Sequence, residues 1–322
     1  MTTWLVTGGA GYIGAHVVRV LKASGRGVVV LDDFSSGEER KVPPGVPIVR
    51  CSVADRAAVA DALRDHRVDG VIHLAAKKAA GESVDLPLHY YRENVIGMIA
   101  LLGSMQDSGV SRLVYSSSAA VYGTPATNPI TEGFPVAPES PYGETKAIGE
   151  WLARDQGIAA ALSWVALRYF NVAGAGSDEL GDNSVNNLVP MVFAALGADR
   201  RPQIFGDDYP TPDGTCIRDY IHVSDLAEAH VVAAARCESG TVAEVFNVGR
   251  GVGSSVREVM ATVSEVIGRD VDAEVVGRRA GDPPASTADT TRIARELGWS
   301  ARHDLRDMVA SAWSAWQAHP PR

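Results

Sequence analysis

The sequence predicts an α/β fold, with a doubly wound parallel sheet and a smaller mixed α/β C-terminal domain. Three observations predict it. A glycine-rich segment near the N-terminus lies between an apolar run and a helical stretch. Further apolar runs of strand length alternate with helical stretches, and the composition becomes rich in loop residues after about residue 171. With 322 residues, of which 46% are hydrophobic and 21% charged, the chain has room for about two domains.

The first βαβ unit occupies about thirty residues. Residues 4–7 are the expected first strand, residues 15–23 the helix that Gly25 closes, and residues 28–31 a buried strand that ends at Asp32. Later apolar runs are expected strands, at residues 71–74, 113–116, 163–167 and 245–248. This alternation places helices on both faces of a parallel sheet.

We expect a domain boundary near residue 170. Residues 172–184 and 199–215 are rich in Gly, Asp, Asn and Pro, which suits a second domain with loop-built pockets. Residues from about 219 to 250 are expected to return to the main sheet, because they contain a further strand.

Charge and cysteine content restrict the partners. The net charge of −9 argues against nucleic acid or an anionic membrane surface as a partner. Cys51, Cys216 and Cys237 have no metal-binding spacing, so no metal site is expected, and so few cysteines favour a reducing compartment. We find no apolar run of membrane-spanning length and no signal-peptide pattern, and we expect a cytoplasmic protein.

The segment GGAGYIG has the spacing GxxGxxG. Glycines at these positions allow a tight turn, close approach to a pyrophosphate and close helix–strand packing, and the helix then offers free N–H groups. Asp32, 18 residues beyond Gly14, suits the ribose hydroxyls of NAD and repels the extra phosphate of NADP. The cofactor-binding residues expected here are Gly8, Gly11, Tyr12, Ile13, Gly14 and Asp32. The alternative is a structural turn with a capping aspartate.

The segment SPYGETK contains a Tyr–Lys pair, YxxxK. Ser140 suits a helix N-cap and Pro141 the first helical position, which puts Tyr142 and Lys146 on one helix face. A nearby ammonium is expected to lower the pKa of Tyr142 and make it a base near neutral pH. The alternative is a surface helix with an ordinary tyrosine.

Ser118 is the expected third catalytic residue. It follows a predicted parallel strand, whose carboxyl end is where ligands bind in open α/β sheets. Its hydroxyl would bond a substrate oxygen and relay the proton to Tyr142. The alternative is strand-end capping, for which Ser116 and Ser117 are equally suitable.

The chain resembles the UDP-glucose 4-epimerases, which are extended short-chain dehydrogenases. The blocks that carry the resemblance are GGAGYIG, GESVDLPLHYYRENV, SSSAAVYG, SPYGETK, RYFNVAGA, FGDDYPTPDGTCIRDYIHV and RRAGDPPASTAD, from Val6 to about Trp299. The resemblance implies a Rossmann domain over residues 1–170 that holds NAD. Residues 171–322 would mainly bind the UDP-sugar.

The implied reaction inverts C4 of a UDP-hexose. Tyr142 takes the proton of the 4-hydroxyl, hydride passes from C4 to NAD⁺, the 4-keto sugar turns over, and hydride returns to its other face. The implied further cofactor residues are Ser52, Val53, Lys78, Asn94, Tyr142 and Lys146. The implied substrate residues are Lys78, Ser118, Tyr142, Asn171, Asn187, Leu188, Phe205, Arg218, Arg279, Asp282 and Ser286.

Several of these residues have a role in the resemblance and a plainer alternative. Phe205 would pack on uracil, or would be ordinary core. Arg218 and Arg279 would neutralise the diphosphate, although Arg218 could instead pair with Asp219. Asp282 would hold the ribose. Asn94 would support the nicotinamide side, or bond the backbone as a helix-face residue.

Three positions depart from the family pattern. Ser52 stands where the family usually has an aspartate under the adenine, which weakens that contact. Asp33 adds a second acid after Asp32 and further disfavours NADP. Ser286 is small where a bulky aromatic residue is associated with rejection of an N-acetyl group, so UDP-GlcNAc and UDP-GalNAc are expected to fit.

Other functions share parts of the same set of motifs. A sugar 4,6-dehydratase needs an acid pair where this chain has Ala119 and Ala120. A UDP-glucuronate or UDP-pentose 4-epimerase uses the same catalytic set and stays open, and a non-catalytic NAD-binding regulator would have lost that set. The resemblance also implies a homodimer through the apolar faces of helices near residues 90–106 and 142–155.

Overall fold

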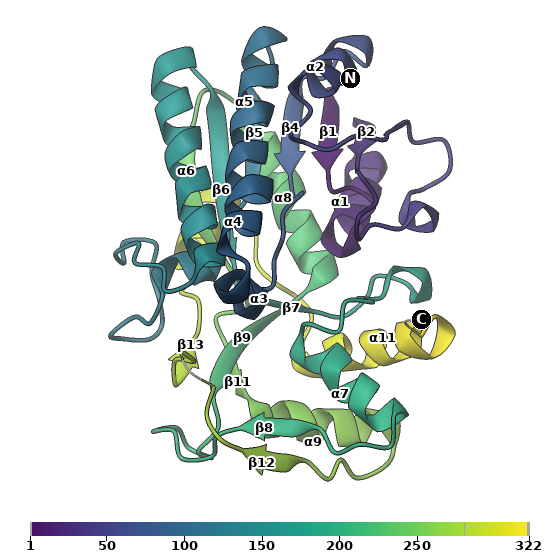
Figure 1. Cartoon of the computed structure of the whole chain (residues 1–322), viewed down its shortest axis with the longest axis vertical. Helices are drawn as coiled ribbons and strands as arrows, with labels where there is room; N and C mark the ends of the chain where they lie inside the picture. The colour runs from purple at the N-terminus through teal and green to yellow at the C-terminus, as the bar shows by residue number, and fades with distance from the viewer. Residues whose placement is uncertain (1, 280, 321–322) are drawn as a thin grey trace. The chain divides into compact units, whose positions relative to one another are not determined.

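The computed structural model describes residues 2–279 and 281–320, and it divides into two compact units. We call unit 1 the segments Met1–Gly123, Pro135–Arg168 and Ala227–Phe246. Unit 2 consists of Thr124–Phe134, Tyr169–Leu226 and Asn247–Arg322. The chain therefore passes between the units several times. Figure 1 labels the elements of both.

Unit 1 contains a seven-stranded sheet in the order β10-β6-β5-β4-β1-β2-β3. Figure 1 labels its strands β1, β2, β4, β5 and β6. Its strands are β1 (Thr3–Thr7), β2 (Gly27–Leu31), β3 (Ile48–Val49), β4 (Gly70–His73), β5 (Arg112–Ser116), β6 (Ser163–Tyr169) and β10 (Ala243–Val248). The pairs from β3 to β6 are all parallel, which confirms the predicted sheet. The strand expected at residues 245–248 is β10, which lies at one edge of this sheet. The two-residue strand β3 was too short to predict.

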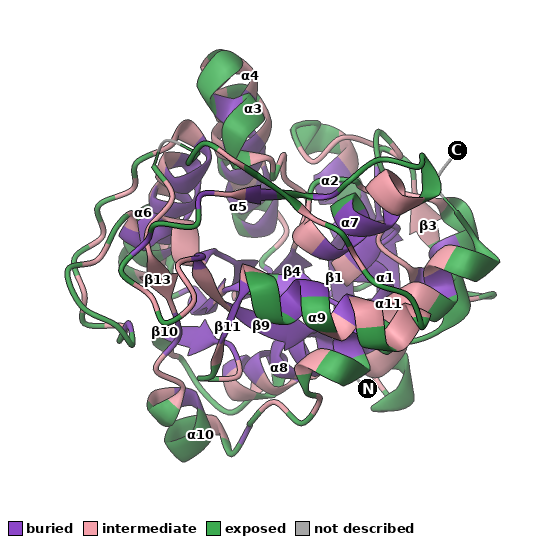
Figure 2. Cartoon of the chain, turned by 90° about the horizontal axis from the view of Figure 1, so that it is seen from below, coloured by how far each residue is buried: buried purple, intermediate pink, exposed green. Residues whose placement is uncertain are grey.

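Helices cover both faces of this sheet. The crossovers that carry α2 (Arg56–Asp65), α5 (Gly97–Asp107) and α6 (Pro141–Ala160) run one way along the sheet, and the one that carries α1 (Tyr12–Ala23) runs the other way. Right-handed crossovers of opposite direction lie on opposite faces. Helix α8 (Val223–Glu238) lies on the side of the sheet away from α5 (Figure 2). Buried Leu, Val and Met side chains of α2 and α5 form the core against the strands.

The segment before α5 is less regular than the sequence predicts. One helix was expected over residues 90–106, but α4 (Pro87–Tyr90) continues into a π-helical turn, Tyr91–Ile96, before α5 begins. A further short helix, α3 (Ala80–Asp85), precedes α4. The helical path near residues 90–106 agrees with the prediction, and only the π-helical turn was missed, because the apolar spacing of a helix does not reveal one extra residue in a turn. Such π-helical turns are frequent at functional sites.

Unit 2 is built around β9 (Ile217–His222). It pairs with β7 (Asn171–Ala173), β11 (Gly253–Ser255) and β13 (Ala285–Ser286). A separate parallel pair joins β8 (Gln203–Phe205) to β12 (Glu274–Val276). The helices are α7 (Leu188–Gly197), α9 (Val256–Ile267), α10 (Thr291–Leu297) and α11 (Leu305–Ala318). Phe193 of α7 packs against Trp313 and Trp316 of α11 in the core.

Within residues 2–279 and 281–320, no helix has the length and apolar character needed to cross a membrane. The same residues contain no group of three or more His, Cys, Asp or Glu side chains arranged to hold a metal ion. All three cysteines are free thiols.

Candidate active site

The glycine-rich loop lies between the end of β1 and the first turn of α1. Gly8 has φ +69°, a left-handed conformation that favours glycine, and a Cβ there would lie 2.9 Å from the amide nitrogen of Ala75. A Cβ on Gly14 would lie 2.0 Å from the carbonyl oxygen of Gly8. Gly11 is the N-cap of α1 and no side chain caps the helix there, and a helix N-terminus of this kind suits a phosphate group.

Asp32 follows β2 and is nearly buried. Its carboxylate accepts hydrogen bonds from the backbone N–H groups of Ala10 and Phe34, both at 2.9 Å. Burial raises the pKa of Asp32, and these two hydrogen bonds only partly offset the effect. The carboxylate therefore fixes the glycine-rich loop, and its remaining lone pairs could accept ribose hydroxyls.

The two residues expected under the adenine follow β3. Ser52 caps its own turn, because its hydroxyl accepts from the N–H of Ala54 at 3.2 Å. Val53 packs against the core of unit 1. Cys51, next to them, is a weak nucleophile, since burial raises the pKa of its thiol to about 11.

The catalytic candidates come together inside unit 1. Ser140 caps α6 through the N–H of Gly143, at 3.2 Å, as the sequence predicts. Tyr142 is buried and is hydrogen-bonded to the hydroxyl of Ser118. Lys146 is also buried, and its Nζ donates to the carbonyl of Ser116 at 2.7 Å and lies 5.9 Å from the ring centre of Tyr142. Ser118 in addition accepts from the N–H of Ala120, which is the capping contact, and its catalytic role stays a prediction.

The protonation states differ from the simple expectation. Burial raises the pKa of Tyr142, and the bond from Ser118 lowers it only in part. Burial also lowers the pKa of Lys146 to about 8. The pKa of Tyr142 therefore lies above its usual value in the protein alone, against the expectation that Lys146 lowers it, because burial outweighs the other influences on the phenol.

Asn94 links two parts of this site. It belongs to the π-helical turn, and its side chain accepts from the N–H of Lys77 at 2.8 Å and donates to the carbonyl of Lys77 at 3.0 Å. It also donates to the hydroxyl of Thr145, which lies on α6 between the catalytic residues. The Nζ of Lys78, the next residue, lies 6.0 Å from the ring centre of Tyr12 at the start of α1. Asn94 thus bonds the backbone of Lys77 and fixes the position of the loop that carries Lys78.

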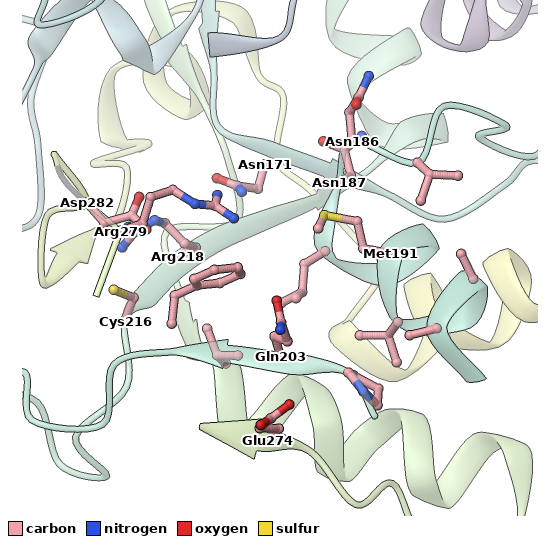
Figure 3. A pocket seen from close by; sticks show the side chains of 18 of the residues that line it. Asn171, Asn186, Asn187, Met191, Gln203, Cys216, Arg218, Glu274, Arg279 and Asp282 are labelled. Atoms are coloured by element: carbon pink, nitrogen blue, oxygen red, sulfur yellow. The ribbon is translucent and has the colours of Figure 1, made fainter. Parts of the chain in front are cut away.

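Unit 2 contains a cavity of about 640 Å³ (Figure 3). The predicted residues that line it are Asn171, Asn187, Leu188, Phe205, Arg218, Arg279 and Asp282. Ser286 is not among its lining residues and instead pairs with Arg218 across β13 and β9. In Figure 3, Arg218, Arg279 and Asp282 gather at one end, and Asn186, Asn187 and Met191 lie toward the other.

The charged end of the cavity is held by local contacts. The guanidinium of Arg279 lies 4.2 Å above the ring centre of Phe205. Arg218 donates to the carbonyls of Ile217 and Pro283 and lies 3.4 Å from the carboxylate of Asp282. The alternative in which Arg218 pairs with Asp219 is wrong, since Asp219 accepts backbone N–H groups of residues 250, 251 and 288.

Some lining residues escaped the sequence analysis. Tyr220 lies two residues after Arg218 on β9, and the period of a strand could have found it on the same side. Cys216 and Gln203 also line the cavity, but no spacing distinguishes them from core residues. In unit 1, a buried cluster around Glu150 and Arg168 also went unpredicted.

A sequence profile of the NAD dependent epimerase/dehydratase family matches residues 4–249. The chain belongs to this family. Its relatives include the UDP-glucose 4-epimerase of Azospirillum brasilense, which is 45% identical over 317 residues, or 97% of this chain and 91% of the relative.

Solved structures in this family include a UDP-glucose 4-epimerase of Stenotrophomonas maltophila with bound NAD and formylated UDP-arabinopyranose. It has a TM-score of 0.94 at 41% identity and covers 99% of this chain and 98% of that one. The UDP-glucose 4-epimerase of Bifidobacterium longum, in complex with NAD⁺ and UDP, has a TM-score of 0.93 at 38% identity and covers 99% of both chains.

Proposed function

We propose that the chain is an NAD-dependent isomerase that inverts C4 of a UDP-hexose and interconverts UDP-glucose and UDP-galactose. The observation that carries the proposal is the buried set of Ser118, hydrogen-bonded to Tyr142, with Lys146 one helical turn further on. UDP-glucose 4-epimerases at 38–45% identity, two of them holding NAD and a uridine nucleotide or its sugar derivative, support it.

The residues of unit 1 fit a dinucleotide. Glycines stand where a Cβ would collide with backbone, the first turn of α1 has no side-chain cap, and an acidic side chain ends β2. We assign the pyrophosphate to the loop of Gly8 to Gly14, the adenosine ribose to Asp32 and the nicotinamide side to Lys146. When bound, NAD⁺ supplies the hydride acceptor for C4 of the sugar and returns the hydride to the same carbon.

The chain's own groups manage the proton. Tyr142 takes the proton of the 4-hydroxyl, and the Ser118 hydroxyl bridges substrate oxygen and phenol. Burial raises the pKa of Tyr142, so the phenol needs nearby positive charge before it can act as a base. A protonated Lys146 and a bound nicotinamide cation would supply that charge. After the 4-keto sugar turns over, the same phenol returns its proton to O4, so no net oxidation occurs.

The cavity of unit 2 is assigned to the uridine nucleotide. Phe205 would stack on uracil, Asp282 would accept the ribose hydroxyls, and Arg218 and Arg279 would bind the diphosphate. We assign Asn171, Asn187 and Leu188 to the same nucleotide. We propose that Lys78 contacts the sugar. Ser286 lies outside the lining of the cavity, and its role in admitting an N-acetyl group stays a prediction.

We propose that the chain forms a homodimer. The support is a set of exposed apolar side chains on α3, α4, α5, α6 and the π-helical turn: Val84, Leu86, Leu88, Ile96, Ile99, Trp151 and Ile158. Exposed apolar faces of this kind are typical of protein contacts. We place the reaction in the cytoplasm, which the three free thiols support.

The test is a comparison of three substrates with one enzyme preparation: UDP-galactose, UDP-GalNAc and UDP-galacturonate. Conversion of UDP-galactose supports the proposal, and comparable rates on UDP-GalNAc extend it to N-acetylhexosamines. Turnover of the uronate alone would replace it with a uronate epimerase. Stoichiometric NAD binding with no turnover of any of them would indicate a non-catalytic regulator.

A further inference from the structure

A buried ion pair lies directly behind the catalytic residues of unit 1. Arg168 donates to both carboxylate oxygens of Glu150, from Nε at 2.8 Å and from Nη2 at 2.5 Å. Each side chain is only 6% exposed. The hydroxyl of Ser117 donates to the same carboxylate at 2.5 Å, and Arg168 also donates to the hydroxyl of Tyr122 at 2.9 Å. Four elements are therefore joined: α6, β6, the end of β5 and the 3₁₀ turn after it.

Stability alone does not explain such a cluster. Well-packed apolar residues of similar volume usually serve a core as well as a buried ion pair. The cluster must therefore be considered with its neighbours. Glu150 lies four residues after Lys146 on α6, which puts the two side chains on one helix face. Ser117, which Glu150 holds, directly precedes Ser118.

The charged group that favours the protonated form of Lys146 is Glu150, because the other neighbours described here are neutral or already paired. From β5, Tyr115 faces Nζ with its ring, 5.3 Å away, and Ser116 offers its carbonyl. From β4, His73 is buried, and burial lowers its pKa to about 3, so it is neutral at working pH. From α8, His230 bonds the Ser116 hydroxyl at 2.7 Å.

The remaining neighbours come from α6 and β6. On α6, Tyr142 faces Lys146 as a protonated phenol, and burial lowers the pKa of Lys146 while Glu150 opposes the fall. On β6, Arg168 has its charge matched by Glu150.

We propose that Glu150 is a positioning residue for the epimerase reaction: its carboxylate, held by Arg168 and Ser117, keeps Lys146 charged and fixes the strand end that presents Ser118. This inference rests on the proposed function for its link to turnover. Its electrostatic part concerns Lys146 alone and can be measured without turnover.

The test is E150Q, which keeps the shape of the side chain and removes its charge. The chain has five lysines, so ¹³Cε-lysine NMR of the full-length protein can follow Lys146, assigned by the signal lost in K146M. We expect the titration midpoint of Lys146 to fall by about one pH unit in E150Q. The alkaline limit of kcat on UDP-galactose should move to lower pH by the same amount, with little change in KM.

The matched control is E144Q, the same change on the same helix, at a carboxylate that bonds Tyr91. It should leave the Lys146 midpoint where it is. A Lys146 midpoint in E150Q equal to that of the wild type, with activity lowered evenly at every pH, would overturn the proposal and leave a structural role.

Because E150Q leaves Arg168 unmatched in the core, a second variant keeps the test decisive. E150Q/R168M removes both charges, and Lys146 should still titrate below the wild-type midpoint. If wild type converts no UDP-galactose, the proposed function fails, while the NMR comparison still decides the role of Glu150.

Discussion

At the residue scale, the reactivity of the site depends on what burial does to each ionisable group. Tyr142 and Lys146 are both buried. Burial raises the pKa of Tyr142 and lowers the pKa of Lys146, so it favours the neutral form of each group. The protein alone therefore holds a protonated phenol beside an amine with a pKa of about 8. Such a site becomes basic only when further positive charge arrives, which couples its reactivity to cofactor binding.

Tyr142→Phe tests the base directly. Removing the hydroxyl should lower kcat on UDP-galactose by about 10²- to 10⁴-fold, the usual range for a general base, with a small change in KM. Steady-state kinetics on purified protein measures this. Tyr91→Phe is the matched control, since Tyr91 bonds Glu144 and should keep activity close to wild type. Equal losses in both variants would contradict the assignment.

Phe205→Ala tests the assigned nucleotide cavity. Loss of stacking on a base costs about 1–3 kcal/mol, so UDP should bind about 5- to 150-fold more weakly. Isothermal titration calorimetry with UDP measures the affinity. NAD binding to the same variant should be unchanged, because Phe205 belongs to unit 2 and the glycine-rich loop to unit 1. Unaltered UDP affinity would make Phe205 an ordinary core residue.

At the element scale, the strands and the two motif-bearing helices follow from local sequence. The apolar runs predicted six strands, and Ser140 and Pro141 predicted the start of α6. The π-helical turn did not follow, because the extra residue changes no apolar spacing. The cluster of Glu150 and Arg168 could not be predicted from local sequence either, since 18 residues separate the two side chains and only the packing of α6 beside β6 brings them together.

Gly14→Ala tests the contact between the loop and α1. The added Cβ would lie 2.0 Å from the carbonyl oxygen of Gly8, so backbone must move. We expect a loss of about 1–3 kcal/mol in unfolding free energy, together with weaker NAD binding. Chemical denaturation and NADH fluorescence measure the two effects. Gly81→Ala is the control, because a Cβ there meets open space. A fully stable G14A with normal NAD affinity would refute the packing argument.

At the scale of the whole molecule, the composition argued against nucleic acid and anionic membranes as partners, but it did not identify a function. A net charge of −9 and 46% hydrophobic residues describe many soluble enzymes equally well. The assignment of the unit 2 cavity to a uridine nucleotide depended on resemblance, because its lining residues come from separate loops, helices and strands whose spacing carries no signal. Ser286 illustrates the limit, since the resemblance assigned it to a pocket wall and it lies outside the lining of the cavity described here.

Trp151→Glu tests the proposed dimer. Trp151 is 46% exposed on α6, and a charge there should disrupt an apolar contact between two chains. Light scattering after size-exclusion chromatography should give twice the mass of 34.0 kDa for wild type and one chain mass for the variant. Val275→Glu, at another exposed apolar residue, in unit 2, should stay dimeric. A monomeric wild type would rule the dimer out.

The interleaved path of the chain has a consequence for its synthesis. The edge strand of the large sheet, β10, comes after two of the three segments of unit 2 in the sequence, and unit 1 is complete only at Phe246 of 322 residues. During translation, the nascent chain must therefore wait, with one sheet edge uncovered, until a large part of the other unit has also left the ribosome. Open sheet edges promote association between chains. Slow translation between residues 170 and 246 would prolong that exposure and favour aggregation before the first turnover.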